Sequence, residues 1–434
     1  MKTEKQMSSS LQSDKRRPIL RESAARRPKR IRGLSLAGSI FILLQLSFNA
    51  LGAESVTQVD TTFQWQSANM ILRQPAESPD SQKLASKAGD PTPLRDNAYN
   101  FHFDSFGAPP PLDFLTKLEP AGSDAVEIDS HYIKFKKYGR TVPLNAALIP
   151  NWADPAEPYA ISAPSFDSVV IVYPYYFYQC KENKYFAELY SLQGRLLQTF
   201  ESLPTHVAVN NPNLLISPER SGCCESIRWD FRFYNIAHKT MTQLACPEGF
   251  CGDVLFEYIN QEGYYLLIQE IIDSVSGVGA YLQTNIYLID NQGNLAASGQ
   301  TIFATKDNRI DKENISTDAP FSLRNLQSVE RIKDDGYWRL HYKTGSKLST
   351  AQITGRAETT SPSALFLLDD QHAAHLTNAE VKIAGFTVKQ LPSLLIATPG
   401  KYMITTRFAS GDTSSQEFEV KPNTINKLPI EFSN

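Results

Sequence analysis

Four of the five cysteines in this 434-residue chain lie in one short window, which reads SGCCESIRWDFRFYNIAHKTMTQLACPEGFC. Thiols can form disulfides, hold a metal as thiolates or act as nucleophiles. We expect disulfides, with Cys246 paired to Cys251 across the CPEGFC loop. We also expect Cys180 to lie close to Cys223 or Cys224. Because five is an odd number, one thiol would then remain unpaired.

The spacing of the cysteines, histidines and carboxylates favours a metal site or a redox site less than it favours disulfides. Cys223 and Cys224 are adjacent, which is awkward for two metal ligands, and no Cys-x-x-Cys occurs. His372 and His375 could chelate a metal from one helical turn, but QHAAH has the pattern of a strand turn. The carboxylates of Lys306–Asp318 could bind Ca²⁺, yet they match no EF-hand spacing. We therefore expect no metal site and no cofactor.

The common catalytic motifs are also missing. The chain has no Gly-x-Ser-x-Gly elbow, no His-Glu-x-x-His, no P-loop and no Gly-x-Gly-x-x-Gly. Catalytic residues therefore stay unassigned. The densest aromatic run, YPYYFYQ from Tyr173 to Gln179, could bind a sugar or a peptide. Alternate side chains of a strand must face the core, however, so half of this run is expected to be packing.

The elements that must position these residues are short strands that recur in a common pattern. From about residue 126, an alternating aromatic and aliphatic strand is followed by a polar turn and a second apolar strand. The five copies begin at Tyr132, Phe186, Phe231, Asn285 and Ala364, with turns at Gly139, Gly194, His238, Gly293 and His372. The middle three copies each follow two further apolar runs. The sequence therefore predicts antiparallel units of four strands that repeat about every 50 residues.

Four-stranded units at this period are typical of propeller blades, and residues 126–376 resemble the β-propeller superfamily. The resemblance implies an all-β, propeller-like array with Tyr190, Tyr234 and Tyr287 at equivalent places in the third strands of successive sheets. All five cysteines would then lie in loops that open at one end of the sheets. A β-sandwich of unrelated meanders is the alternative.

The last segment, residues 377–434, has a different pattern of alternating strands and Pro, Gly or Asn turns. It resembles the small surface β-sandwich called PEGA. The matching pieces are Pro399-Gly400-Lys401-Tyr402, Ile404, Phe408, Phe418, Val420 and Pro422-Asn423. The resemblance implies a C-terminal β-sandwich that holds a surface or a partner.

Residues 54–125 precede the repeats and have another composition. They are rich in Pro, Ser, Asp and Lys and show no periodicity. This composition predicts an irregular arm or linker, with one strand near Tyr99–Phe106.

The first 53 residues predict an export signal. Residues 1–33 carry a net charge of +8, and Leu34–Ala53 is uncharged, largely apolar and ends in small residues. We expect cleavage near Ala53 and a periplasmic or secreted protein. An uncleaved anchor through Leu34–Ala53 is the alternative, because twenty uncharged residues can span a bilayer.

The net charge of the chain limits the kinds of molecule that the protein can be expected to bind. The whole chain has a net charge of −3, which leaves −11 for residues 54–434. Such a domain is poorly suited to binding nucleic acid or anionic membranes. We expect a non-enzymatic binding or scaffold protein of the bacterial cell envelope, which binds protein or glycan through a loop face. The alternative is a polysaccharide hydrolase or lyase with a carboxylate pair in the propeller channel.

Overall fold

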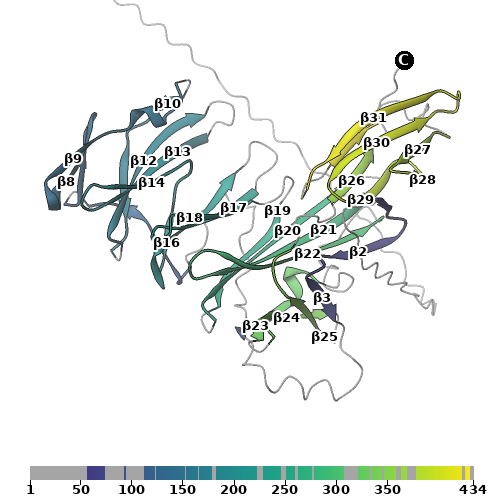
Figure 1. Cartoon of the computed structure of the whole chain (residues 1–434), viewed down its shortest axis with the longest axis horizontal. Helices are drawn as coiled ribbons and strands as arrows, with labels where there is room; N and C mark the ends of the chain where they lie inside the picture. Colours follow the sequence, from purple (N-terminus) through teal and green to yellow (C-terminus); the bar gives the residue numbers. More distant parts are fainter. Residues whose placement is uncertain are drawn as a thin grey trace, which may run out of the picture. The chain divides into compact units, whose positions relative to one another are not determined.

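The structure is a computed structural model (Figure 1). The residues it describes are 56–73, 92–93, 112–122, 124–151, 153–164, 166–177, 182–221, 228–245, 251–259, 262–275, 278–306, 321–332, 335–344, 347–357, 363–368, 378–422 and 426–430. The predicted leader lies outside them. Among the described residues, no helix has the length and the hydropathy needed to cross a bilayer.

The described chain is all-β, as the sequence predicts. Its strands form seven sheets, and the β26–β32 pair is the one parallel pairing among the described strands. Helical structure in the described part is limited to three 3₁₀ turns, η3 (Lys136–Tyr138), η4 (Ala146–Leu148) and η5 (Leu323–Asn325).

Five sheets follow one another along the chain and are called sheets I to V. Sheet I consists of β7 (Val126–Ile128), β8 (Tyr132–Phe135) and β9 (Arg140–Pro143). Sheet II consists of β11 (Tyr159–Ser162), β12 (Ser168–Phe177), β13 (Glu182–Ser191) and β14 (Leu196–Phe200), with β10 (Asp154–Pro155) paired to β12. Sheet III consists of β15 (His206–Ala208), β16 (Asn211–Ser221), β17 (Arg228–Asn235) and β18 (Thr240–Leu244). Sheet IV consists of β19 (Cys251–Ile259), β20 (Tyr264–Val275), β21 (Gly279–Asp290) and β22 (Leu295–Thr305). Sheet V contains β23 (Leu326–Ile332), β24 (Tyr337–Thr344) and β25 (Lys347–Ile353).

Sheets II, III and IV confirm the predicted four-stranded unit, because in each of them four consecutive strands pair in chain order. Tyr190, Tyr234 and Tyr287 lie in the third strands of these three different sheets, as expected. The turn glycines of sheets II and IV have φ values of 71° and 83°. In sheet III the left-handed residue is Lys239, one position after the expected His238.

Apolar side chains at alternating strand positions pack each sheet onto the next. Separate hydrophobic clusters join sheets I and II, II and III, III and IV, and IV and V. In sheet IV, for example, Phe256 and Tyr265 face sheet III, whereas Leu266 and Ile268 face sheet V. Both faces of such a sheet are buried, which explains the nearly continuous apolar runs in the sequence.

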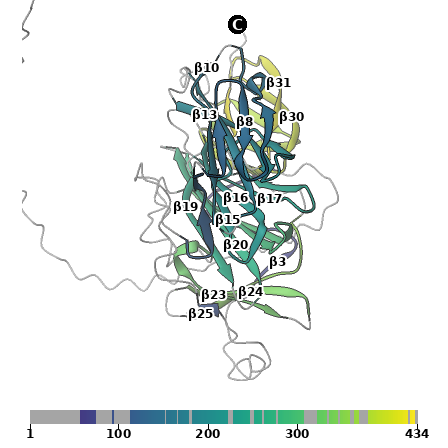
Figure 2. The same ribbon diagram turned by 90° about the vertical axis from the view of Figure 1, so that its left-hand side faces the viewer.

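The described parts of the arm at residues 54–125 contain short strands, although its composition predicts irregular structure. Its described strands are β1 (Val56–Gln58), β2 (Thr62–Gln66), β3 (Met70–Arg73), β4 (Thr92–Pro93), β5 (Leu115–Lys117) and β6 (Glu119–Pro120). Strand β2 extends sheet IV, β5 extends sheet III and β6 extends sheet II. Strands β3 and β4 occupy opposite edges of sheet V, where β3 pairs with β25 and β4 pairs with β23. Figure 2 shows β3 near the strands of sheet V. The strand expected at Tyr99–Phe106 lies outside the described residues.

Two further sheets contain the C-terminal strands. Sheet VI consists of β1, β29 (Ser393–Ala397), β26 (Ser363–Leu368) and β32 (Asn426–Pro429). Sheet VII consists of β28 (Phe386–Val388), β27 (Glu380–Ile383), β30 (Gly400–Arg407) and β31 (Thr413–Val420). The two sheets share one hydrophobic cluster, and sheet VI also packs against sheet IV. Strand β26, which the sequence grouped with the repeats, thus pairs with strands of the C-terminal segment.

Candidate functional site

A buried carboxylate lies on sheet II at a position where apolar side chains are expected. Glu188 of β13 is opposite Ile171 of β12 and Thr199 of β14, and it is only 1% exposed. Its side chain therefore shares the face of sheet II that packs against sheet I, together with Tyr173 and Tyr190. Burial of a charged group is unfavourable unless its oxygens are hydrogen-bonded.

Three protein groups supply those hydrogen bonds. The hydroxyls of Tyr173 and Tyr190 donate to Oε2 of Glu188 at 2.6 and 2.9 Å. The side-chain amide of Asn145 donates to Oε1 at 2.9 Å, and its backbone N–H donates to the Tyr173 hydroxyl at 3.4 Å. Within the described part of the chain, no lysine or arginine forms an ion pair with Glu188. The carboxylate is thus held by neutral donors, and no described cation forms an ion pair with it.

The approach of sheet I to sheet II brings Asn145 to this carboxylate. Phe135 of β8 packs on Tyr190, with ring centroids 5.5 Å apart. At Gly194, in the β13–β14 turn, a Cβ atom would lie 2.8 Å from the Phe135 ring. The absence of a side chain at Gly194 therefore lets the two sheets come close together. Asn145, which follows β9, then reaches Glu188.

An open cavity of about 360 Å³ lies beside this cluster. Its lining residues are Arg140, Val142, Pro143, Leu144, Asn145, Glu188, Tyr190, Gly194 and Leu196. Glu188 and Tyr190 are buried at its floor, whereas Arg140, Pro143 and Leu196 are exposed at its rim. The Arg140 guanidinium donates to the carbonyl of Gln193 at 3.4 Å. The cavity is next to the turn between the third and fourth strands of sheet II, β13 and β14.

Tyr173 and Tyr190 act as neutral hydrogen-bond donors to Glu188. Burial raises the pKa of Tyr173, and the hydrogen bond and negative charge of Glu188 raise that pKa further. Burial followed by the charge of Glu188 raises the pKa of Tyr190 in the same way. Both hydroxyls are therefore protonated at neutral pH. A carboxylate has about four acceptor positions, so one position on Oε1 is left for a donor on a ligand.

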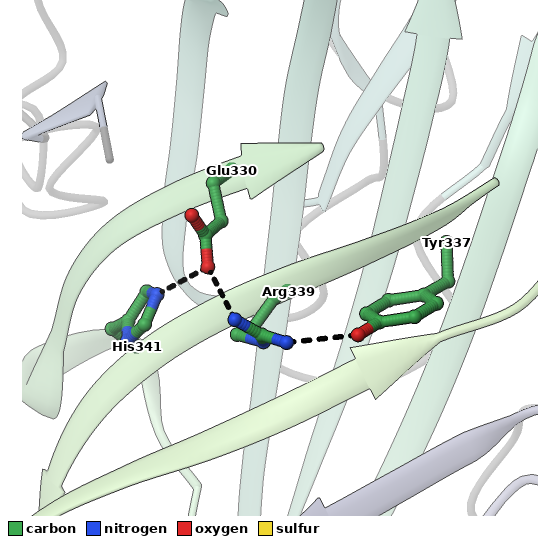
Figure 3. A network of polar contacts seen from close by, with 4 residues as sticks. All are labelled: Glu330, Tyr337, Arg339 and His341. Carbon is green, nitrogen blue, oxygen red and sulfur yellow. Dashed lines mark hydrogen bonds and ion pairs between the residues drawn. The ribbon is translucent and has the colours of Figure 1, made fainter. Parts of the chain in front are cut away.

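A second buried carboxylate, Glu330, lies on sheet V, on the face opposite to the side chains that pack against sheet IV. Figure 3 shows it with Tyr337, Arg339 and His341. Oε1 of Glu330 accepts from Nη1 of Arg339 at 2.9 Å and lies 3.0 Å from Nε2 of His341. Arg339 also donates to the Tyr337 hydroxyl at 2.8 Å. Here a cation compensates the carboxylate, which is the arrangement of a structural ion pair. Within the described chain, the side-chain partner of His341 is this carboxylate rather than a serine or a cysteine.

The disulfide candidates lie almost entirely outside the described residues. Cys251 is placed only as the first residue of β19, and nothing is described for Cys180, Cys223, Cys224 or Cys246. The strands that flank them, β12 with β13, β16 with β17 and β18 with β19, are those that the sequence predicts. The pairing itself stays a prediction. Non-reducing peptide mapping that found all five thiols free would contradict it.

The candidate metal ligands are outside the described residues as well. QHAAH and all four carboxylates of Lys306–Asp318 belong to undescribed segments. In the part of the chain that the structure describes, no group of three or more His, Cys, Asp or Glu side chains could hold a metal.

Sequence reasoning singled out Tyr173, through the aromatic run, but missed Glu188 and Asn145. The segment FAELY contains a signal for Glu188, because Phe186 and Tyr190 lie on the same face of the strand as the glutamate. A charged residue in an inward phase marks a buried polar site. Asn145 carries no comparable signal, because it lies outside any strand.

No family model matches the chain, and no curated protein sequence is similar to it.

Proposed function

We propose that the protein is a non-enzymatic binding protein of the bacterial cell envelope and that the Glu188 cavity binds an envelope glycan or protein. The observation that carries the proposal is a buried, hydrogen-bonded carboxylate at the floor of an open cavity. Binding sites combine largely apolar walls with a few fixed polar groups. Val142, Leu144 and Leu196 provide the walls here, and Glu188 provides the fixed acceptor.

The proposal includes a propeller-like arrangement of sheets I to V and a PEGA-like sandwich of sheets VI and VII. The repeated four-stranded sheets support the first part. The hydrophobic cluster between sheets VI and VII supports the second part. The basic segment before Leu34–Ala53 supports export to the periplasm or the medium.

The alternative is an enzyme that cleaves envelope polysaccharide. Glycoside hydrolases generally use two carboxyl groups, roughly 5 to 10 Å apart. The lining of the described cavity contains one carboxylate, Glu188. Binding without turnover is therefore the better supported function of this cavity.

The test compares binding of envelope glycan fragments and of purified envelope proteins by the wild type and by Leu196→Trp. Leu196 is 47% exposed at the rim, so an indole there should fill the mouth of the cavity with little effect on folding. Leu348→Trp is the matched control, because Leu348 is a 52% exposed leucine on β25 of sheet V.

We expect saturable binding by the wild type and by Leu348→Trp, loss of binding by Leu196→Trp, and no change in the glycan. New reducing ends or unsaturated sugars would instead assign the protein to the polysaccharide-active enzymes. Binding that Leu196→Trp leaves intact would show that the cavity is not the binding site.

A further inference from the structure

We infer that the Glu188 cavity recognises an unacetylated amino sugar, a pyranose ring that carries a primary ammonium group. The inference rests on the proposed binding function and names its ligand class. Its basis is the juxtaposition of a buried carboxylate, with which no described cation forms an ion pair, and a cavity large enough for one sugar ring.

The Glu188 carboxylate at the floor of the cavity favours a ligand that carries a cationic hydrogen-bond donor. Glu188 receives hydrogen bonds from three neutral groups, and the described residues offer it no ion-pair partner. An ammonium group at the remaining position of Oε1 would form a charge-assisted hydrogen bond, which is roughly twice as strong as a neutral one. Burial of the carboxylate strengthens the attraction, because the local dielectric is lower than that of water.

The walls and the rim favour a sugar ring over a bare alkylamine. A volume of about 360 Å³ lies near the lower end of the range for small-molecule pockets, about 300 to 1,000 Å³. Val142, Leu144 and Leu196 offer apolar surface to the C–H face of a ring. Arg140 at the rim can donate to ring hydroxyls. Its guanidinium is exposed to solvent, so its repulsion of an ammonium group is screened.

Three ligands that differ at one ring position test the inference on the wild type. Glucosamine carries an ammonium group at C2, glucose a hydroxyl and N-acetylglucosamine an acetamide. We expect calorimetry to show glucosamine binding about 10-fold to 100-fold more tightly than glucose, and N-acetylglucosamine binding no better than glucose. Butylamine is the fourth probe. If it binds as tightly as glucosamine, the cavity recognises an amine without a sugar, and the inference is overturned.

Two substitutions, one of Glu188 at the floor of the cavity and one of Leu196 at its rim, distinguish the effect of the carboxylate from the effect of the cavity's shape. Glu188→Gln should remove the preference for glucosamine over glucose, whereas Glu201→Gln, at an exposed glutamate after β14, should keep it. In Glu188→Gln an amide group faces the donors of the tyrosines and Asn145, so its fold must be checked by thermal melting. Leu196→Trp gives a second test that leaves these hydrogen bonds intact, and it should abolish binding of glucosamine.

The outcomes distinguish this inference from the proposed function. If the wild type binds glucosamine no better than glucose while Leu196→Trp still abolishes glycan binding, the amino-sugar inference is wrong and the binding function stands. If Leu196→Trp changes the binding of no ligand, both are wrong.

Discussion

Two tyrosines in equivalent strands differ in what their hydroxyls contact. Tyr190 of sheet II donates to Glu188, whereas the buried hydroxyl of Tyr234 in sheet III has no hydrogen-bond partner within the described structure. Tyr190→Phe leaves Glu188 with one donor fewer and should lower the free energy of unfolding by about 1 to 3 kcal/mol. Tyr234→Phe removes an unsatisfied group and should be neutral or stabilising. Urea unfolding measures both, and equal losses would contradict this account.

His206 gives the protein a defined sensitivity to acid. Burial, with a smaller contribution from Lys117, lowers its pKa from 6.5 to about 4. Between these pH values the unfolded chain binds a proton that the folded chain does not bind. Stability should therefore fall as the pH drops from 6.5 towards 4. His206→Gln should make this part of the stability curve flatter. Urea midpoints over this range measure the effect, and parallel curves for both proteins would rule out His206 as its source.

At the scale of elements, the hairpin turns fix the spacing between neighbouring sheets. Gly293, in the β21–β22 turn, has φ 83°, and a Cβ there would lie 2.7 Å from the Leu214 side chain of β16. Gly336 has φ 69° and no atom within 4 Å of such a Cβ. Alanine at either position incurs the left-handed backbone penalty of about 1 to 2 kcal/mol. Gly293→Ala should destabilise the protein more, because its methyl group would also crowd the buried Leu214 and Phe233 side chains of sheet III. Thermal melting of the two variants side by side tests this difference.

The strands differ in how far the sequence could predict them. The strands of sheets II, III and IV were predictable because apolar residues recur along them and polar turns separate them. Strands such as β4 and β6 contain two residues each, too few to show a period, and their pairing partners are distant in the chain. The Glu188 site was predictable only in part: FAELY marks the glutamate, but nothing in the sequence marks the group that binds it. Its donor Asn145 is 43 residues away, and only the packing of two sheets brings the groups together.

At the scale of the whole molecule, the N-terminal arm is part of the core. Met70 of β3 is 1% exposed and lies in the cluster between sheets IV and V. Met70→Ala should cost about 2 to 5 kcal/mol through lost burial and the cavity it leaves. Met241→Ala is the control, because Met241 is 57% exposed, and it should change stability by less than about 0.5 kcal/mol. Similar urea midpoints for the two variants would show that the arm contributes little.

The arm also determines when the fold can be completed. Val56 of β1 pairs with Ala397 of β29, and the Gln58 side chain donates to Ser393, 335 positions later. During synthesis, β1 and β2 emerge from the ribosome long before the strands that pair with them. Domains dominated by such non-local pairings have a high contact order and fold slowly. Strand β1 therefore cannot take its place at the edge of sheet VI until β29, more than 300 residues later in the chain, has been synthesised.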